Sequence, residues 1–102
     1  MEIIHGKQDN FNNLISSGTV LVDFFATWCG PCKMLGTVLE QLKEDRADGK
    51  IVKIDVDECS ELAKNYGVMS VPTMILFENG KMIDKKIGFM SKEEITNWIE
   101  SK

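Results

Sequence analysis

The stretch TVLVDFFATWCGPCK, residues 19–33, decides the fold of this chain. Its apolar first half predicts a β-strand over residues 19–26, and the helical spacing of the apolar residues after Pro31 predicts a helix that begins at the turn. The turn places Cys29 and Cys32 at the amino end of that helix. Because unpaired backbone amides and the helix dipole favour an anion there, we expect Cys29 to form a thiolate readily.

The spacing of the two cysteines predicts their chemistry. Three residues of helix put both sulfurs on one side of the helix start, close enough to form a disulfide. We therefore predict that Cys29 is a nucleophile and Cys32 the resolving thiol. A Cys-x-x-Cys pair can also belong to a zinc site, which needs about four ligands. The other candidate ligands, Cys59 and His5, stand alone and far apart, so we favour the redox interpretation and expect no metal.

Length, composition and charge restrict the class of protein. A chain of 102 residues, 43% hydrophobic and 27% charged, predicts one globular domain over residues 1–102. The net charge of -4, with both signs interspersed, argues against nucleic acid and anionic membranes as partners. No apolar run approaches the roughly 18 residues of a spanning helix, and the first residues do not read as a secretion signal. Three cysteines do not suit a secreted disulfide framework, so we expect a cytoplasmic protein.

Outside this stretch the chain predicts four more strands and three more helices. The strands are expected over residues 2–5, 50–56, 73–77 and 81–87, and the helices over residues 10–17, 58–65 and after Ser91. Asp9 is expected to cap the first of these helices, and Ser91 and Glu94 form a capping box for the last. Asn79-Gly80 predicts a hairpin between the last two strands. This order indicates an α/β protein with a mixed sheet, parallel strands joined through helices and an antiparallel hairpin at one edge.

These motifs together resemble the thioredoxin family. The resemblance rests on WCGPCK after an apolar strand with one aspartate, on Val71-Pro72-Thr73, on the Asn79-Gly80 hairpin and on Gly88, and it covers nearly the whole chain. It implies a thioredoxin fold, with a central mixed sheet of about five strands flanked by about four helices. It also implies a monomeric protein-disulfide reductase that binds no cofactor itself. Thioredoxin reductase, an NADPH-dependent flavoprotein, would recharge it, and protein disulfides would be its clients.

Asp23 is the candidate proton acceptor for the resolving step. A lone carboxylate in an apolar strand is costly unless it is paired, protonated or hydrogen-bonded, and burial should raise its pKa towards neutrality, where a general base works best. The alternative is that the side chain tips into solvent at the strand end. The resemblance implies a buried aspartate at this position, with Lys53 close to it, although Lys53 could instead be an exposed strand lysine.

The resemblance also implies a client-binding groove beside the dithiol. It implies a cis peptide bond before Pro72, which would leave the backbone of Val71 free to pair with an extended client segment. Gly88 would allow a client backbone to approach closely. The family commonly has a small residue where this chain has Phe89, so we hypothesise that Phe89 adds apolar bulk to the groove rim and biases client choice. The alternative is that Phe89 packs against the last helix.

Three further residues shape the expected site. Gly30 and Pro31, between the cysteines, resemble the reductases of the family more than its oxidases or isomerases. Trp28 is expected to flank the dithiol, although a place in the core is the commoner fate of a tryptophan. The alternatives that stay open are a disulfide isomerase or oxidase of the same fold, and a binding role in which the reduced protein is a subunit or regulator of a larger enzyme.

Overall fold

The apolar strand before the cysteines, β2 (Thr19–Phe25), lies at the centre of a five-stranded sheet. The computed structural model describes residues 1–102. The strand order is β1-β3-β2-β4-β5, with β1 and β2 parallel to β3, and β4 antiparallel to both β2 and β5. The other strands are β1 (Glu2–His5), β3 (Lys50–Asp55), β4 (Thr73–Glu78) and β5 (Lys81–Ile87). The chain therefore has the predicted mixed sheet, with β1 and β5 as its edges.

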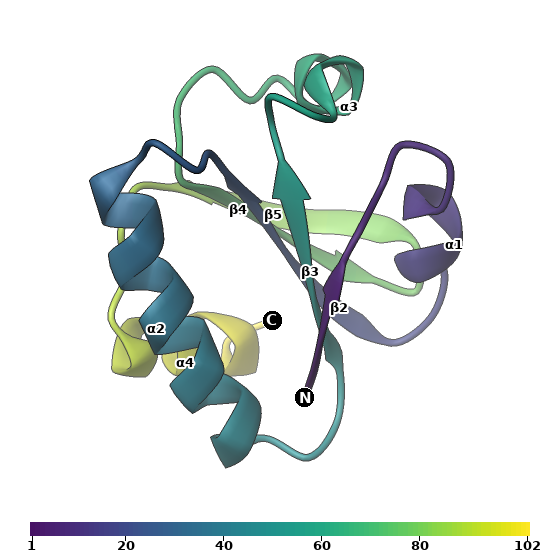
Figure 1. The fold of residues 1–102 in the computed structure, drawn as a ribbon. Helices are drawn as coiled ribbons and strands as arrows, with labels where there is room; N and C mark the ends of the chain where they lie inside the picture. The colour runs from purple at the N-terminus through teal and green to yellow at the C-terminus, as the bar shows by residue number, and fades with distance from the viewer.

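Four helices cover the two faces of this sheet. They are α1 (Phe11–Leu14), α2 (Gly30–Asp45), α3 (Ser60–Asn65) and α4 (Lys92–Glu100). Figure 1 shows α2 and α4 on one side of the sheet and α1 and α3 on the other. None of these helices combines the length and the apolar character that a membrane crossing requires. The architecture is the predicted α/β arrangement, a mixed five-stranded sheet flanked by four helices.

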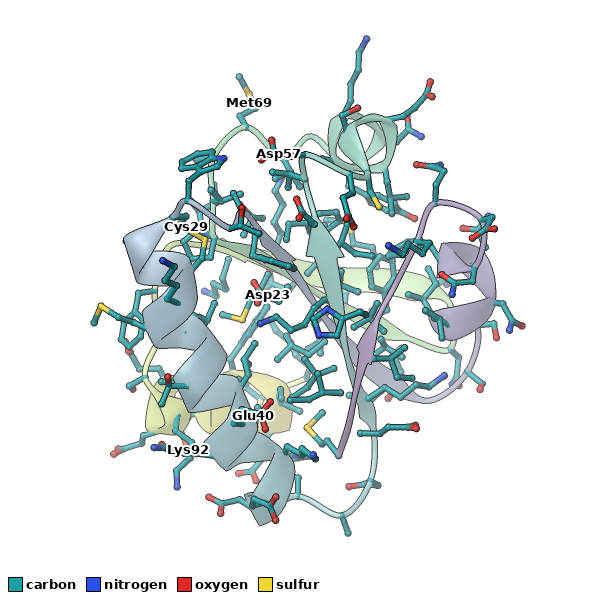
Figure 2. All side chains as sticks on the ribbon, viewed as in Figure 1. Asp23, Cys29, Glu40, Asp57, Met69 and Lys92 are labelled. Carbon is teal, nitrogen blue, oxygen red and sulfur yellow. A yellow bond between two sulfur atoms is a disulfide. The ribbon has the colours of Figure 1, made fainter.

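Alternation along β2 divides the core into two layers. Val20, Val22 and Phe24 pack with the residues of α1 and α3, whereas Leu21 packs with α2 and α4. Because successive side chains of a strand point to opposite faces, Asp23 lies on the same face as Leu21, under α2 (Figure 2). The sheet therefore aims the one carboxylate of β2 at the helix that carries Cys32.

Two helix starts differ from the sequence prediction. Asp9 does not cap the first helix, which begins at Phe11 and is shorter than predicted. Asn10 occupies the cap position, but its side-chain oxygen accepts the backbone N–H of Lys7, at 2.8 Å, instead of a helix amide. The third helix begins at Ser60, because the preceding residues form a turn on the Asp55 side chain. The capping box of Ser91 and Glu94 is confirmed, with both hydrogen bonds present.

Helix α2 runs without interruption through Gly36 and Thr37. Thr37 keeps the backbone N–H that a proline lacks, so the ladder of the helix can continue. Gly36 is the weak point of the ladder, because glycine loses more backbone freedom in a helix than alanine does.

We expect Gly36→Ala to raise the free energy of unfolding by about 0.5–1 kcal/mol. A Cβ at this position would contact only Lys53 Nζ, at 3.4 Å, so the helix gains propensity with little crowding. Urea unfolding at pH 7 measures the change. Gly49→Ala is the matched control and should lose stability, because Gly49 has a positive φ of 91° and its Cβ would lie 3.1 Å from the Thr19 carbonyl oxygen. A less stable Gly36→Ala protein would show that the helix needs glycine at this position.

Candidate active site

The two active-site cysteines lie where β2 ends and α2 begins. Cys29 is the N-cap residue of α2, with extended backbone angles, and Pro31 occupies the first turn. Cys29 and Cys32 are joined in a disulfide, and the Cys32 backbone N–H donates to Cys29 Sγ at 3.2 Å. Only 5% of Cys29 and 3% of Cys32 is exposed. This amide and the amino end of the helix place positive partial charges beside the Cys29 sulfur.

Asp23 is buried behind this pair and has no hydrogen-bond partner within the protein. Its exposure is 0%, and neither carboxylate oxygen accepts a hydrogen bond. The side chain therefore does not tip into solvent. Burial raises its pKa from 3.8 to about 7, and the positive charge of Lys53 only partly opposes that rise. A carboxyl group with this pKa changes protonation state near neutral pH, as a general base must.

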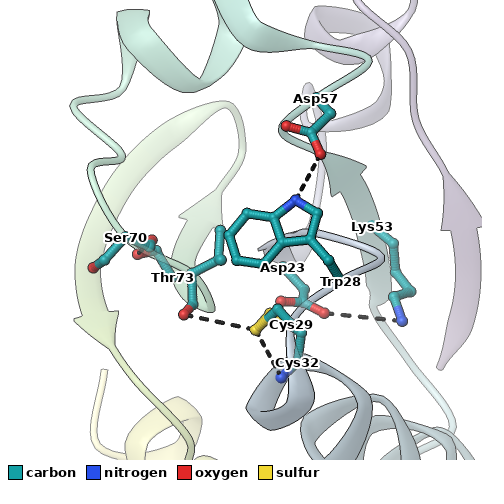
Figure 3. Close-up of a disulfide and its surroundings, with 9 residues drawn as sticks. Asp23, Trp28, Cys29, Cys32, Lys53, Asp57, Ser70 and Thr73 are labelled. Carbon is teal, nitrogen blue, oxygen red and sulfur yellow. Dashed lines mark hydrogen bonds and ion pairs between the residues drawn. A yellow bond between two sulfur atoms is a disulfide. The ribbon is translucent and has the colours of Figure 1, made fainter.

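Lys53 is held beside Asp23 by the register of the sheet. The two residues pair across the parallel strands β2 and β3, and Lys53 Nζ lies 4.0 Å from Asp23 Oδ2. The ammonium also lies 4.9 Å from the centre of the Phe25 ring, a cation–π arrangement. The side chain is 18% exposed, so Lys53 is not the freely exposed strand lysine of the alternative. In Figure 3 the Asp23 carboxylate is seen behind the disulfide, with Lys53 on its far side.

Lys53 faces an open hollow of about 530 Å³ that also reaches Cys32. Thr37 and Glu40 of α2 complete much of its polar lining. The hollow gives solvent a route to the neighbourhood of Cys32 and of the Lys53–Asp23 pair.

Trp28 lies on the opposite side of the disulfide and is 70% exposed. Its indole N–H donates to Asp57 Oδ2 at 2.9 Å, which fixes the ring beside the dithiol (Figure 3). Asp57 is not among the residues that the sequence predicts at this site. The available signal was its position just after β3, because the carboxyl ends of parallel strands meet at the same edge of the sheet. A second hollow, of about 370 Å³, lies beside the Trp28 ring. The side chains that line it are those of Trp28, Val56, Val68, Met69, Ser70 and Val71.

The loop before β4 forms another wall of the site. The peptide bond between Val71 and Pro72 is cis, as predicted, and Cys29 Sγ lies 3.8 Å from the Val71 carbonyl oxygen. The Pro72 carbonyl accepts the N–H of Gly88 at 2.8 Å. Gly88 has a positive φ of 96°, with open space where a Cβ would lie. Phe89 is 43% exposed, so part of its ring is open to solvent.

The remaining cysteine lies outside the site. Cys59 is buried at the start of α3, and burial raises the pKa of its thiol. It therefore lacks the exposure and the thiolate character of a reactive cysteine. The structure contains no group of three or more His, Cys, Asp or Glu side chains that could hold a metal ion.

Comparisons with known proteins agree with this geometry. The model of the thioredoxin family matches residues 2–101. Thioredoxin of Staphylococcus saprophyticus is 50% identical over 102 residues, and the match covers 98% of this chain and 97% of that relative. Thioredoxin of Bacillus subtilis is 47% identical over 100 residues, and the match covers 97% of this chain and 96% of that relative. Among solved structures, a mutant thioredoxin from Halobacterium salinarum superposes with a TM-score of 0.88 at 39% identity, covering 98% of this chain and 88% of that one.

Proposed function

This chain belongs to the thioredoxin family and is a thiol-disulfide oxidoreductase that reduces protein disulfides; from that premise we propose which residues carry out each step. The observation that carries the function is the Cys29–Cys32 disulfide at the start of α2, with a backbone N–H directed at Cys29 Sγ. The pair can give two electrons and two protons to a client disulfide and return to the oxidised state.

The reaction proceeds by two thiol exchanges. The Cys29 thiolate attacks one sulfur of the client disulfide, which forms a mixed disulfide and releases the other client sulfur as a thiolate. Cys32 then loses its proton and attacks Cys29 Sγ. This second exchange forms the Cys29–Cys32 disulfide and releases the second client sulfur, so the client is reduced and the protein is oxidised.

Asp23 is the acceptor of the Cys32 proton in this proposal. Its burial under α2, its lack of hydrogen-bond partners and its pKa near 7 support that role. Lys53, 4.0 Å away, limits the rise of that pKa and would stabilise the carboxylate before it takes the proton. The proton can then leave to solvent through the hollow that Lys53 and Cys32 share.

Clients bind, in this proposal, along the loop of Val71 and Pro72. An extended client segment would pair with the backbone of Val71 as a short added strand, next to Cys29. The open space at Gly88 would let the client backbone approach, and the hollow beside Trp28 would take an apolar client side chain. Backbone pairing tolerates many sequences, as a reductase with many clients requires.

Phe89→Ala is expected to slow the reduction of some client proteins more than others. The half-exposed ring lies next to Gly88 and can cover apolar client surface worth about 1 kcal/mol, a factor of about 5 in rate for the clients that use it. Initial rates on several protein disulfides measure the effect. Met82→Ala is the matched control, because Met82 is also exposed on β5 but pairs with Phe77 at the other end of the strand. Equal rates across all clients would contradict the proposal.

Electrons reach the pair, we propose, from NADPH through the flavoprotein thioredoxin reductase, with no cofactor held by this chain. The family membership and the thioredoxin relatives support this route. It requires a reducing compartment, so the proposed place of action is the cytoplasm, and the whole chain works as a one-domain monomer. NADPH consumption in the presence of a bacterial thioredoxin reductase and insulin tests the route. Turnover with dithiothreitol but none with the reductase would overturn it.

A further inference from the structure

The client-binding loop is held at both ends by the edge strand β5. The loop runs from Val68 to Pro72, between the end of α3 and the start of β4. At its far end the Pro72 carbonyl accepts the N–H of Gly88, the residue directly after β5. At its near end the ammonium of Lys85 donates to two carbonyls, Tyr66 O at 3.2 Å and Gly67 O at 3.1 Å.

The near-end contact is built into the fold. Lys85 pairs with Ile75, whose side chain belongs to the core layer under α1 and α3, so the lysine reaches across that face towards the end of α3. Tyr66 is the C-cap residue of α3 and Gly67 follows it, so neither carbonyl has a partner within the helix, and a lysine ammonium near a helix C-terminus can bond to such carbonyls. The backbone leaves α3 at Gly67 with a positive φ of 66°, and a Cβ there would lie 3.5 Å from Lys85 Nζ.

The middle of the loop has few other restraints. Met69 is 96% exposed. Thr73 Oγ donates to the Ser70 carbonyl at 2.7 Å, near the far end, and the N–H of Val68 bonds to Ala63 at 2.9 Å, near the start. The N–H of Gly67 also donates to the Lys64 carbonyl at 3.1 Å, and the contacts from Lys85 and Gly88 add to these bonds at the start and the end of the loop. Between them lies Val71, whose carbonyl oxygen is 3.8 Å from Cys29 Sγ.

We propose that Lys85 is a positioning residue for client binding: its ammonium fixes the start of the Val68–Pro72 loop and so holds the Val71 backbone and the hollow beside Trp28 ready for the client. This inference rests on the proposed role of the loop in binding clients. Preorganised binding elements bind more tightly because less conformational freedom is lost on association. Loss of the ammonium weakens client binding and leaves the dithiol chemistry unchanged.

Lys85→Met tests this inference, because methionine keeps the apolar stem and removes the donor. With insulin as the client and dithiothreitol as the reductant, the KM for insulin is expected to rise about 5- to 10-fold, the equivalent of one or two net hydrogen bonds. The kcat, the redox midpoint and the rate with the small disulfide 5,5′-dithiobis(2-nitrobenzoate) stay unchanged. Lys85→Arg, which keeps the charge and donors, restores most of the KM. Lys86→Met, an exposed lysine paired with Met74 across β4 and β5, is the matched control and behaves like the wild type.

Two results would overturn the inference. One is a KM of Lys85→Met equal to that of Lys86→Met, and the other is a parallel fall of kcat and of the small-disulfide rate, which would mark general damage. If Lys85→Met is too unstable to assay, Lys85→Gln, which is too short to reach both carbonyls, gives the same comparison.

A Cys32→Ser protein locked in a mixed disulfide with a client peptide separates the two proposals, client binding by the loop and the positioning role of Lys85. An unchanged NMR signal of the Val71 amide would refute client binding by the loop itself, and a shifted signal with an unchanged KM would refute the role of Lys85 alone.

Discussion

With serine in place of Cys29, the protein is expected to lose disulfide reduction by on the order of 10³-fold or more. Serine keeps the N-cap geometry and can still accept the Cys32 N–H, but its hydroxyl does not ionise near neutral pH and does not attack disulfides. The rate of insulin reduction with dithiothreitol measures the loss, after subtraction of the uncatalysed reaction. Unchanged stability, measured by urea unfolding of the reduced proteins, would show that the loss is chemical.

Cys32→Ser should fail at a different step. Cys29 can still attack the client, but no resolving thiol follows, so a mixed disulfide accumulates. Non-reducing mass spectrometry after mixing with an oxidised client peptide should find the adduct with Cys32→Ser and not with Cys29→Ser. The reverse pattern would exchange the roles of the two cysteines. Reductant-dependent activity in both single variants would contradict the dithiol mechanism altogether.

The second large effect is a dependence of stability on pH that comes from Asp23. Its pKa rises from 3.8 when exposed to about 7 in the folded protein. The stabilising contribution of the neutral carboxyl is complete below about pH 4 and is lost as the pH rises through about 7, because ionisation is then easier in the unfolded chain. A shift of this size corresponds to about 4 kcal/mol.

Asp23→Asn should remove this dependence, because the amide does not titrate. The free energy of unfolding of the variant minus that of the wild type should therefore be about 4 kcal/mol larger at pH 8 than at pH 4. Urea unfolding of the oxidised proteins across this pH range measures the difference. The buried, unpaired amide of asparagine changes the free energy of unfolding by the same amount at pH 4 and at pH 8, so it does not affect the comparison. A wild-type protein with the same pH profile as Asp23→Asn would show that the carboxyl ionises freely and is not the buried acid described above.

The same variant tests the proposed proton transfer. With no carboxylate to take the Cys32 proton, release of the client from the mixed disulfide should slow at pH 7 by on the order of 100-fold. Attack by Cys29 should change far less. The release rate should recover as the pH approaches the pKa of the thiol itself, because hydroxide then replaces the base. Equal release rates at pH 7 in Asp23→Asn and the wild type would remove Asp23 from the mechanism.

Local signals in the sequence predicted most of the fold and the dithiol. The apolar run before Cys29, the proline at the helix start, the Asn79-Gly80 turn and the Ser91 capping box each act within a few residues, and the structure has the elements that they indicate. The first helix was predicted too long and with the wrong cap residue. Asn10 occupies the cap position, and its side-chain oxygen accepts a hydrogen bond from the Lys7 N–H of the preceding turn instead of from a helix amide.

Contacts between distant segments could not be predicted in the same way. The sequence left open whether Asp23 is buried, because that depends on the strands on both sides of β2 and on the helix above it. The bond from Trp28 to Asp57 spans 29 residues, and that from Lys85 to Tyr66 spans 19. Lys85 reaches α3 only because of the register of β5, which shifts between Leu76 and Phe77, and no pattern in the sequence specifies that irregularity.

An equilibrium redox titration of the purified protein against dithiothreitol buffers tests the central claim most directly. Alkylation and mass measurement count the free thiols at each potential. We predict one two-electron transition in which the count rises from one, Cys59, to three, with a midpoint well below about −180 mV, the value of a disulfide isomerase. Cys29→Ser should show no such transition. A midpoint at or above about −180 mV would indicate an oxidase or isomerase, and no transition in the wild type would contradict the redox role of the Cys29–Cys32 pair.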